Sequence, residues 1–400
     1  MSAPLQTASP PSGDPLPAGL APFDFRPRTR VVFGPGVFAQ LGTLARELGG
    51  TRVLLVSDPG LRSVGHVDRA VQLLREARLE VACFDEVQEN PTTVDVDRAV
   101  TVARAARSDL LIGLGGGSSL DCAKGASFLL SNAGRMEDYW GYAKATRPLL
   151  PLLAVPTTAG TGSEAQSYAI IAQAESHVKM ACGDPGAAPR IALLDPELTL
   201  TLPRSVTAIT GIDAISHAVE SFVSTRRNPL SSLFAEQAAR LLVNAFPQVL
   251  AQPHDPVARG QMLWGAHLAG MAIENSMLGA AHACANPLSA LCGLTHGIAV
   301  GVMLPHVVRY NQEVAPALYA PLLTSLGFDR THEADAGATL ARLLTTLLEA
   351  GQLPTRLGSC GVPSERIPQL AAQATHQWTG KFNPRPVTQA DFQLLYERAL

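Results

Sequence analysis

The sequence is poor in lysine and in aromatic residues, and it holds no uninterrupted apolar run long enough to span a bilayer. Only four of its 400 residues are lysines, aromatic residues make up 5%, and the formal net charge is −3. Basic charge is carried almost wholly by arginine. Because the net charge gives no electrostatic attraction for nucleic acid or an anionic membrane, we expect neither as a partner.

Paired cysteines and a secretory leader are also lacking. The six cysteines are scattered and form no C-x-x-C pair, which suits a reducing compartment better than a disulfide framework. Residues 1–21 are rich in Pro, Ser and Gly, but they lack the basic start and continuous apolar core of a signal peptide. We therefore predict a disordered tail over residues 1–21 and a cytoplasmic location.

Four hundred residues exceed the usual size of a single hydrophobic core, so two domains are expected. Apolar strands alternate with helical patterns over residues 22–203, which predicts an α/β domain with a parallel sheet. Residues 204–400 show helical periodicity and no convincing strand, which predicts an all-α domain. Strands are expected at residues 30–36, 52–56, 80–84, 110–114 and 149–155. Helices are expected at residues 67–77, 94–106, 118–130, 208–223, 229–251, 257–275, 279–291 and 296–311.

A glycine-rich turn follows the strand at residues 110–114. Its three glycines, at 115–117, carry no Cβ, so a ligand can approach the backbone closely. We expect Ser118 to cap the next helix, with Asp121 completing a capping box, and the free N–H groups at the helix start to attract a pyrophosphate. The turn is not the G-x-G-x-x-G fingerprint, because Ser118 takes the place of the last glycine, and a plain tight turn stays an alternative.

A second turn, at residues 156–164, also follows an apolar strand and is rich in threonine and glycine. Its hydroxyls can hydrogen-bond a diphosphate or a nicotinamide ribose, although a plain loop has the same composition. Asp58 follows an earlier strand, where an acid can bind a ribose 2′-OH and repel a 2′-phosphate. That position favours NAD over NADP, but Asp-Pro-Gly at 58–60 is equally a simple turn signal.

Four residues in the second half of the chain suggest a metal site. Asp213 and His217 are four residues apart, so on a helix they share one face. His282 and His296 lie in an otherwise apolar stretch. Three imidazoles and one carboxylate suit a divalent transition metal such as Fe or Zn. Each residue also has a simpler explanation, because a single histidine in an apolar helix is more often a hydrogen-bonded core residue.

Taken together, these segments resemble the iron-containing (group III) alcohol dehydrogenases. They run in the family's order and are Gly115–Ser118 with Asp121 and Lys124, Pro156–Glu164, Asp195–Leu198, Gly211–Glu220, His296–Gly297, Leu304–Val307 and Asn383–Pro386. The resemblance implies a dehydroquinate-synthase-like fold, in which a Rossmann-like nucleotide-binding domain and a helical domain enclose the site in a cleft. It also implies a homodimer.

The resemblance implies roles for individual residues. It carries metal ligation onto Asp213, His217, His282 and His296. It carries cofactor contact onto Asp58, Asn90, Gly115, Gly116, Gly117, Ser118, Asp121, Thr157, Thr158, Thr161 and Lys179, of which Asn90 and Lys179 match more loosely. The cofactors implied are NAD, favoured over NADP, and Fe²⁺, with Zn²⁺ as the alternative metal.

One position departs from the family's pattern. The family usually has a second histidine four residues after His282, thought to lie near the nicotinamide and to assist proton relay, where this chain has Asn286. Ser289 also stands where the family usually has glycine. Asparagine cannot shuttle a proton through a pKa near 7, but it can hydrogen-bond a substrate hydroxyl or the nicotinamide. We include Asn286 with the four ligands among the catalytic residues and leave the relay and the substrate preference open.

The predicted function is that of a metal-dependent alcohol dehydrogenase or aldehyde reductase, which transfers a hydride between a small alcohol or diol and NAD. Residues 271–279 and 288–293 are nearly uncharged, which favours a small neutral substrate. One alternative is a related enzyme of the same fold, such as a polyol or polyol-phosphate dehydrogenase or a maleylacetate reductase. Another is a catalytically impaired homologue that binds nucleotide or metal without turnover.

Overall fold

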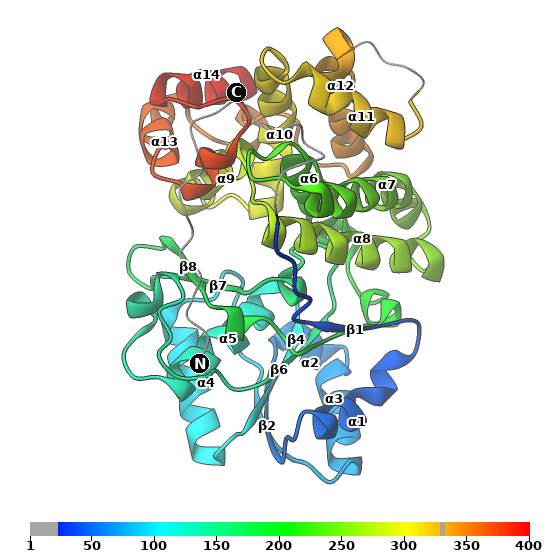
Figure 1. Cartoon of the computed structure of the whole chain (residues 1–400), viewed down its shortest axis with the longest axis vertical. Helices are drawn as coiled ribbons and strands as arrows, with labels where there is room; N and C mark the ends of the chain where they lie inside the picture. Colours follow the sequence, from blue (N-terminus) through cyan, green and yellow to red (C-terminus); the bar gives the residue numbers. More distant parts are fainter. Residues whose placement is uncertain (1–22, 329–332) are drawn as a thin grey trace.

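The computed structural model of the chain describes residues 23–328 and 333–400 (Figure 1). The tail predicted over residues 1–21 lies outside the described residues. Within them, the last strand ends at Leu194 and the first long helix of the second half begins at Arg204. Figure 1 shows the strands gathered at one end of the molecule and the helices of the second half at the other. The predicted fold class, an α/β part followed by a helical part, is confirmed.

Six strands form one parallel sheet in the order β1-β9-β6-β4-β2-β3. From β2 the chain moves first to β3 on one side and then to β4 on the other, so the strand order reverses between β2 and β4. Open α/β sheets bind ligands outside the carboxyl ends of the strands at such a reversal. The strands are β1 (Arg30–Phe33), β2 (Arg52–Val56), β3 (Glu80–Phe84), β4 (Leu110–Gly115), β6 (Leu152–Pro156) and β9 (Ile191–Leu194).

Side chains along each strand alternate between two faces of this sheet, and both faces are buried. In β2, Val53 and Leu55 belong to one apolar cluster, whereas Leu54 and Val56 belong to another. Burial on both faces explains why the strands appear in the sequence as continuous apolar runs. The first cluster includes α1 (Leu41–Glu47) and α3 (His66–Glu76), and the second includes α4 (Thr93–Ala106) and α5 (Gly117–Ser131).

A smaller sheet, which the sequence pattern does not predict, stands beside the parallel one. In it β5 (Gly141–Tyr142) pairs in parallel with β8 (Lys179–Gly183), and β8 pairs antiparallel with β7 (Tyr168–Ala172). These strands are short and only partly buried, and Ile171 of β7 packs into the apolar cluster of α5. Periodicity does not reveal them because what stabilises them is packing against distant parts of the chain.

The second half of the chain is a stack of helices around α6, which packs against α7, α8 and α10 (Figure 1). The five helices expected here are present with ends shifted by no more than four residues, and their shared core is rich in alanine. The helices are α6 (Arg204–Val223), α7 (Pro229–Ala251), α8 (Pro256–Asn275), α9 (Ala280–Cys292), α10 (His296–Gln312), α11 (Pro316–Ser325), α12 (Glu333–Ala350), α13 (Ile367–Ala374) and α14 (Gln389–Ala399).

The loop after β6 touches the backbone of α8 directly, and a glycine makes this contact possible. Gly162 has a φ of +61°, a backbone conformation that residues other than glycine rarely adopt. A Cβ at Gly162 would lie 2.7 Å from the Cα of Gly270 and 2.8 Å from the carbonyl oxygen of Ala266. Since both neighbours are backbone atoms of α8, no side-chain movement can relieve the clash.

We predict that Gly162→Ala destabilises the protein by about 3 kcal/mol, because it adds a backbone clash to the strain of a positive φ. The matched control is Gly49→Ala, since Gly49 has a φ of +80° but nothing within 4 Å of its Cβ position. The control is expected to lose only about 1 kcal/mol. Urea unfolding of both variants measures the difference, and equal losses would show that the close approach to α8 is unimportant.

Candidate metal and cofactor site

Three helices bring the predicted metal ligands together. Asp213 and His217 lie one turn apart on α6, His282 lies in the first turn of α9, and His296 is the first residue of α10. The Nε2 atoms of His217, His282 and His296 lie 3.5, 3.7 and 3.9 Å from one oxygen, Oδ1 of Asp213. The rings of His217 and His282 are stacked with centroids 4.8 Å apart.

Several polar atoms of this cluster lack a hydrogen-bond partner among the described residues. Oδ1 of Asp213 and Nε2 of His282 are buried and accept or donate no hydrogen bond within the described part of the chain. One ligand atom each from Asp213, His217 and His282 lies within 4.8 Å of the others. Leaving buried polar atoms unpaired is costly, so atoms that converge on one point in this way fit a bound divalent cation. His296 is less tightly placed, and its side chain is 25% exposed.

The electrostatics of Asp213, His217 and His296 suit a cation, whereas His282 favours the protonated form when no metal is bound. Burial opposes ionisation of Asp213, but the three histidines outweigh that effect and hold its pKa below the usual range. Burial lowers the pKa of His217 and, together with the charge of Lys179, that of His296, so both imidazoles favour the neutral form that ligates metals. Burial also acts on His282, but Glu220 and Asp213 prevail and raise its pKa to about 9.

Glu220, which the sequence reasoning did not assign, orients His282. Its Oε2 lies 2.5 Å from Nδ1 of His282, and its Oε1 accepts a hydrogen bond of 2.7 Å from the backbone N–H of Ala281. An acceptor at Nδ1 holds a proton there, so Nε2 is the ring nitrogen that would bind a metal once its own proton is displaced. The signal was present in the sequence, because Glu220 follows His217 by three residues inside the segment that resembles the family.

The metal candidates share one cleft of about 490 Å³ with most of the predicted cofactor contacts. It lies between the carboxyl edge of the parallel sheet, β7, β8 and the helices of the second half. The predicted site residues that line it are Asn90, Gly116, Gly117, Ser118, Asp121, Thr158, Thr161, Lys179, Asp213, His217, His282, Asn286 and His296.

Asp58, Gly115 and Thr157 are the predicted cofactor residues outside that lining. Asp58 caps the short helix α2 (Pro59–Ser63) by accepting a hydrogen bond of 3.1 Å from the N–H of Leu61. It still stands at the reversal of strand order, since its Oδ2 is 3.2 Å from the Cβ position of Gly115. Thr157 is buried, and its backbone N–H donates to the carbonyl of Gly115.

The predicted capping of α5 is wrong. The helix begins one residue earlier than expected, at Gly117, and its N-cap is Gly116, which has no side chain to cap with. Ser118 therefore lies inside the first turn, where its Oγ accepts a hydrogen bond of 3.3 Å from the N–H of Asn90. The N–H groups of the first turn stay free for a ligand, and a Cβ at Gly117 would come within 2.6 Å of Thr161.

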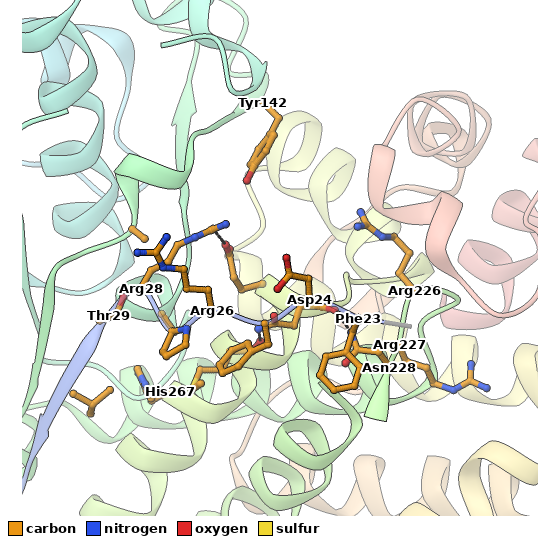
Figure 2. A pocket seen from close by; sticks show the side chains of 18 residues that line it. Phe23, Asp24, Arg26, Arg28, Thr29, Tyr142, Arg226, Arg227, Asn228 and His267 are labelled. Carbon is orange, nitrogen blue, oxygen red and sulfur yellow. Dashed lines mark hydrogen bonds and ion pairs between the residues drawn. The ribbon is translucent and has the colours of Figure 1, made fainter. Parts of the chain in front are cut away.

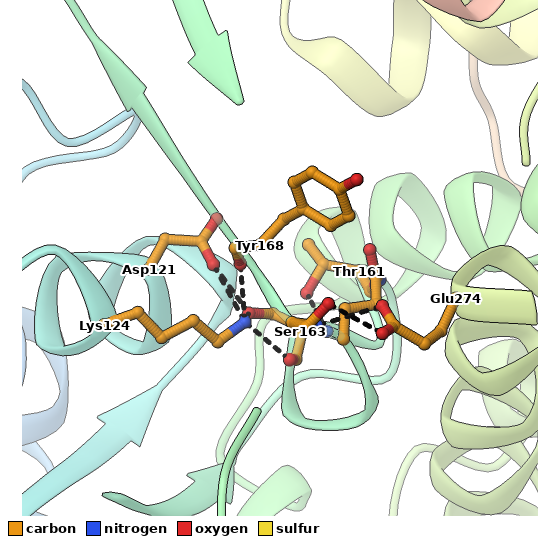
Figure 3. A network of polar contacts seen from close by, with 8 residues as sticks. Asp121, Lys124, Thr161, Ser163, Tyr168 and Glu274 are labelled. Atoms are coloured by element: carbon orange, nitrogen blue, oxygen red, sulfur yellow. Dashed lines mark hydrogen bonds and ion pairs between the residues drawn. The ribbon is translucent and has the colours of Figure 1, made fainter. Parts of the chain in front are cut away.

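Asp121 belongs to a buried polar network rather than to a cap (Figure 3). Nζ of Lys124 donates to the carbonyl and hydroxyl oxygens of Ser163, each at 2.7 Å, and to the carbonyl of Tyr168 at 2.8 Å. Ser163 Oγ in turn donates to Asp121 at 2.6 Å. The network ties the threonine-rich loop to α5 and β7, and Lys124 is fully buried within it.

A second cavity of about 410 Å³ is lined in part by Glu274 and holds none of the predicted site residues (Figure 2). Its wall is formed by the segment before β1 and by residues of α8, with Tyr142 at one end. Arg28 crosses it to pair with Glu274 at 3.0 Å. Glu274 also accepts hydrogen bonds from Ser167, at the end of the loop between β6 and β7. The wall of this cavity and that loop are therefore joined through one carboxylate.

Comparison with known proteins gives matches along nearly the whole chain. The profile described as iron-containing alcohol dehydrogenase matches residues 27–196, and the C-terminal profile of the Fe-containing alcohol dehydrogenase family matches residues 207–400. The chain is 35% identical to the 1,3-propanediol dehydrogenase of Klebsiella pneumoniae over 94% of its own length and 98% of that protein. It is 33% identical to the NAD-dependent methanol dehydrogenase of Bacillus methanolicus, covering 92% and 97% of the two chains.

The fold has close counterparts among solved structures. A crystal structure of 1,3-propanediol oxidoreductase superimposes with a TM-score of 0.92 at 35% identity, covering 95% of this chain and 100% of that one.

We predict that Lys124→Met lowers the free energy of unfolding by about 3–5 kcal/mol, because it leaves Asp121 buried without its cation. The control is Lys144→Met, which removes the same charge from an exposed position and is expected to change stability by about 0.5 kcal/mol or less. Chemical unfolding compares them, and adding Asp121→Asn is expected to recover part of the loss. A Lys124→Met variant as stable as the control would refute the role of the network.

We predict that Glu220→Gln lowers metal affinity by about 10–100-fold. A glutamine whose oxygen accepts from Ala281 turns its NH₂ toward Nδ1 of His282, which forces the imidazole proton onto Nε2 and blocks ligation. Metal content after equilibrium dialysis against Zn(II) measures the effect. Glu197→Gln, at an exposed position, serves as the control, and retention of metal by folded Glu220→Gln equal to that of this control would contradict the prediction.

Proposed function

Since this chain belongs to the iron-containing alcohol dehydrogenase family, we propose that it transfers a hydride between a small alcohol and NAD in the cleft described above. Family membership confirms the predicted class of enzyme. The observation that carries the proposal is that buried, unpaired Asp213 and His282 atoms converge with His217 in the same cleft as two glycine-containing turns.

The residues that would hold the metal are Asp213, His217, His282 and His296, with Glu220 fixing the tautomer of His282. When bound, a divalent metal supplies a Lewis acid that polarises the substrate oxygen, and the nicotinamide supplies the hydride acceptor. Iron is favoured by the family, although zinc binds the same donors at least as tightly. The side chains of Asp213, His217 and His282 are buried, which strengthens their electrostatic interaction with a bound cation.

The residues that would hold the cofactor lie at the carboxyl edge of the sheet. The free N–H groups at the start of α5 suit a pyrophosphate, and the hydroxyls of Thr158 and Thr161 line the cleft beside them. Asp58, at the reversal of strand order, supports NAD over NADP, since its carboxylate repels a 2′-phosphate. The NAD-dependent methanol dehydrogenase among the relatives supports the same choice.

The lining of the cleft favours a small neutral substrate over a phosphorylated or carboxylated one. Of the described residues that line it, Lys179 is the only lysine or arginine, and it stands near Asp213 and Asp121. The helical wall is apolar, with Ile273, Met277 and Leu278. A polyol-phosphate dehydrogenase or a maleylacetate reductase would need further cations to bind its substrate.

We keep the cytoplasm as the proposed location, because the described cysteines are all free. A homodimer, suggested by the family, likewise remains a proposal. Among the described residues no helix is both long and apolar enough to pass through a bilayer.

We predict that anaerobically purified protein forms NADH from primary alcohols, and that Asp213→Asn lowers the rate by about 100-fold or more, because it removes the only carboxylate among the ligands. Absorbance at 340 nm measures turnover with Fe(II), Zn(II) or EDTA present. Asp68→Asn, at an exposed position, is the matched control and is expected to behave as the wild type. Turnover that persists in EDTA, or in Asp213→Asn after its metal content falls, would refute the proposed use of a metal.

A further inference from the structure

A pair of amide side chains lies on the wall of the cleft, one helical turn beyond a metal candidate. Asn286 follows His282 by four residues on α9, so both residues lie on the same face of the helix. Nδ2 of Asn286 donates a hydrogen bond of 2.9 Å to Oε1 of Gln377, which immediately precedes the short 3₁₀ helix at Trp378–Phe382. Both amides line the cleft that holds the metal and cofactor candidates.

The pair presents one hydrogen-bond donor and one acceptor to the cleft. Oδ1 of Asn286 and Nε2 of Gln377 bond to no other group in the described parts of the chain, and neither atom is sealed off from solvent. Exchanging the oxygen and nitrogen of both amides swaps the two roles but still leaves one donor and one acceptor free. A hydroxyl group, which donates one hydrogen bond and accepts others, is complementary to such a pair.

The surroundings distinguish a hydroxyl from a charged group. The neighbouring lining is apolar or aromatic, with Met277, Leu278 and Trp378, and the ring of Trp378 packs against that of Tyr168 with centroids 5.8 Å apart. A carboxylate or phosphate would meet a free amide oxygen and too few donors here. A substrate with a purely apolar alkyl group would displace solvent from the two amides and offer them no hydrogen bond in return.

We propose that Asn286 and Gln377 form a specificity-determining subsite that binds a second hydroxyl group of the substrate, so that the enzyme prefers diols to simple alcohols. This inference rests on the proposed function. Four residues of helix advance by about 6 Å, so the second hydroxyl must stand a few bonds from the one that reacts. Gln377 is a residue that neither the sequence motifs nor the metal cluster identifies.

The test compares substrates that differ only by a hydroxyl replaced with a methyl group. In 1-butanol a methyl group stands in place of the second hydroxyl of 1,3-propanediol, and 2-methyl-1-propanol is related to 1,2-propanediol in the same way. For the metal-loaded wild type with NAD, we expect kcat/KM to be higher for at least one diol than for its partner by about 10-fold or more, because the partner leaves the amides unpaired.

Nearly isosteric variants assign that preference to the pair. Asn286→Leu and Gln377→Met are each expected to lower the ratio of kcat/KM, diol over matched alcohol, by about 10-fold. The control Gln72→Met, on the exposed side of α3, is expected to leave the ratio unchanged. Quenching of tryptophan fluorescence by the diol, which we expect because Trp378 adjoins Gln377, provides a binding measurement that does not require turnover.

Different outcomes refute the two proposals. Turnover of alcohols with a ratio near one, unchanged in Gln377→Met, would overturn the diol subsite and leave the proposed function standing. A higher rate for every alcohol in Asn286→His would overturn it too, since it would identify Asn286 as a lost proton relay. Absence of turnover with every alcohol and aldehyde, in protein that is folded and holds metal, would overturn the proposed function and the subsite with it.

Discussion

The buried carboxylate of Asp213 is the constraint on which the rest of this structure depends. A carboxylate 95% removed from solvent is stable only beside compensating charge or hydrogen bonds. In the described part of the chain, imidazole nitrogens from three helices surround this carboxylate, and no lysine or arginine pairs with it. His217 and His296 favour the neutral form and compensate only partly, and a bound cation would take the place of the proton that Glu220 and Asp213 favour on His282.

Grouping these side chains around one carboxylate also constrains how the helices pack. For three helix segments to place ring nitrogens within 4 Å of one oxygen, α6, α9 and α10 must approach closely, and their shared core is accordingly rich in alanine. Gly297, next to His296, would place a Cβ 2.4 Å from the carbonyl oxygen of Ile209, so a larger residue there would push α10 away. Small residues at these contacts thus serve the geometry of the site.

The relation between the two halves of the chain rests on similar close contacts. Gly162 touches the backbone of α8, and Glu274 of α8 accepts two hydrogen bonds from Ser167. Lys124 holds the same loop from the other side. Because one loop carries the cofactor candidates and these contacts, its position relative to the metal candidates is set by buried polar groups.

The sequence alone predicted those features of the fold and the site that depend on residues close together in the chain. Asp213 and His217 could be paired because a helix places residues four apart on one face, and the strands of the parallel sheet could be found because they are uniformly apolar. That His282 and His296 join them follows from helix packing, which spacing does not encode; their residue types only suggested it, and the resemblance to a family supported it. Gln377 was missed for the same reason, since it acts through a contact distant in sequence, whereas Glu220 was overlooked although it stands three residues after His217.

The structure also bears on what the replacement of histidine by Asn286 means. A site that has lost its function has no reason to retain buried charges, which are costly unless each finds its partner. Here Lys124 pairs with Asp121, Glu220 pairs with His282, and Asp213 faces imidazole nitrogens, so each buried charge has a complementary neighbour. The change at 286 replaces one polar side chain by another, and the new one has a partner in Gln377. A changed substrate preference accounts for this pattern better than a loss of catalytic activity does.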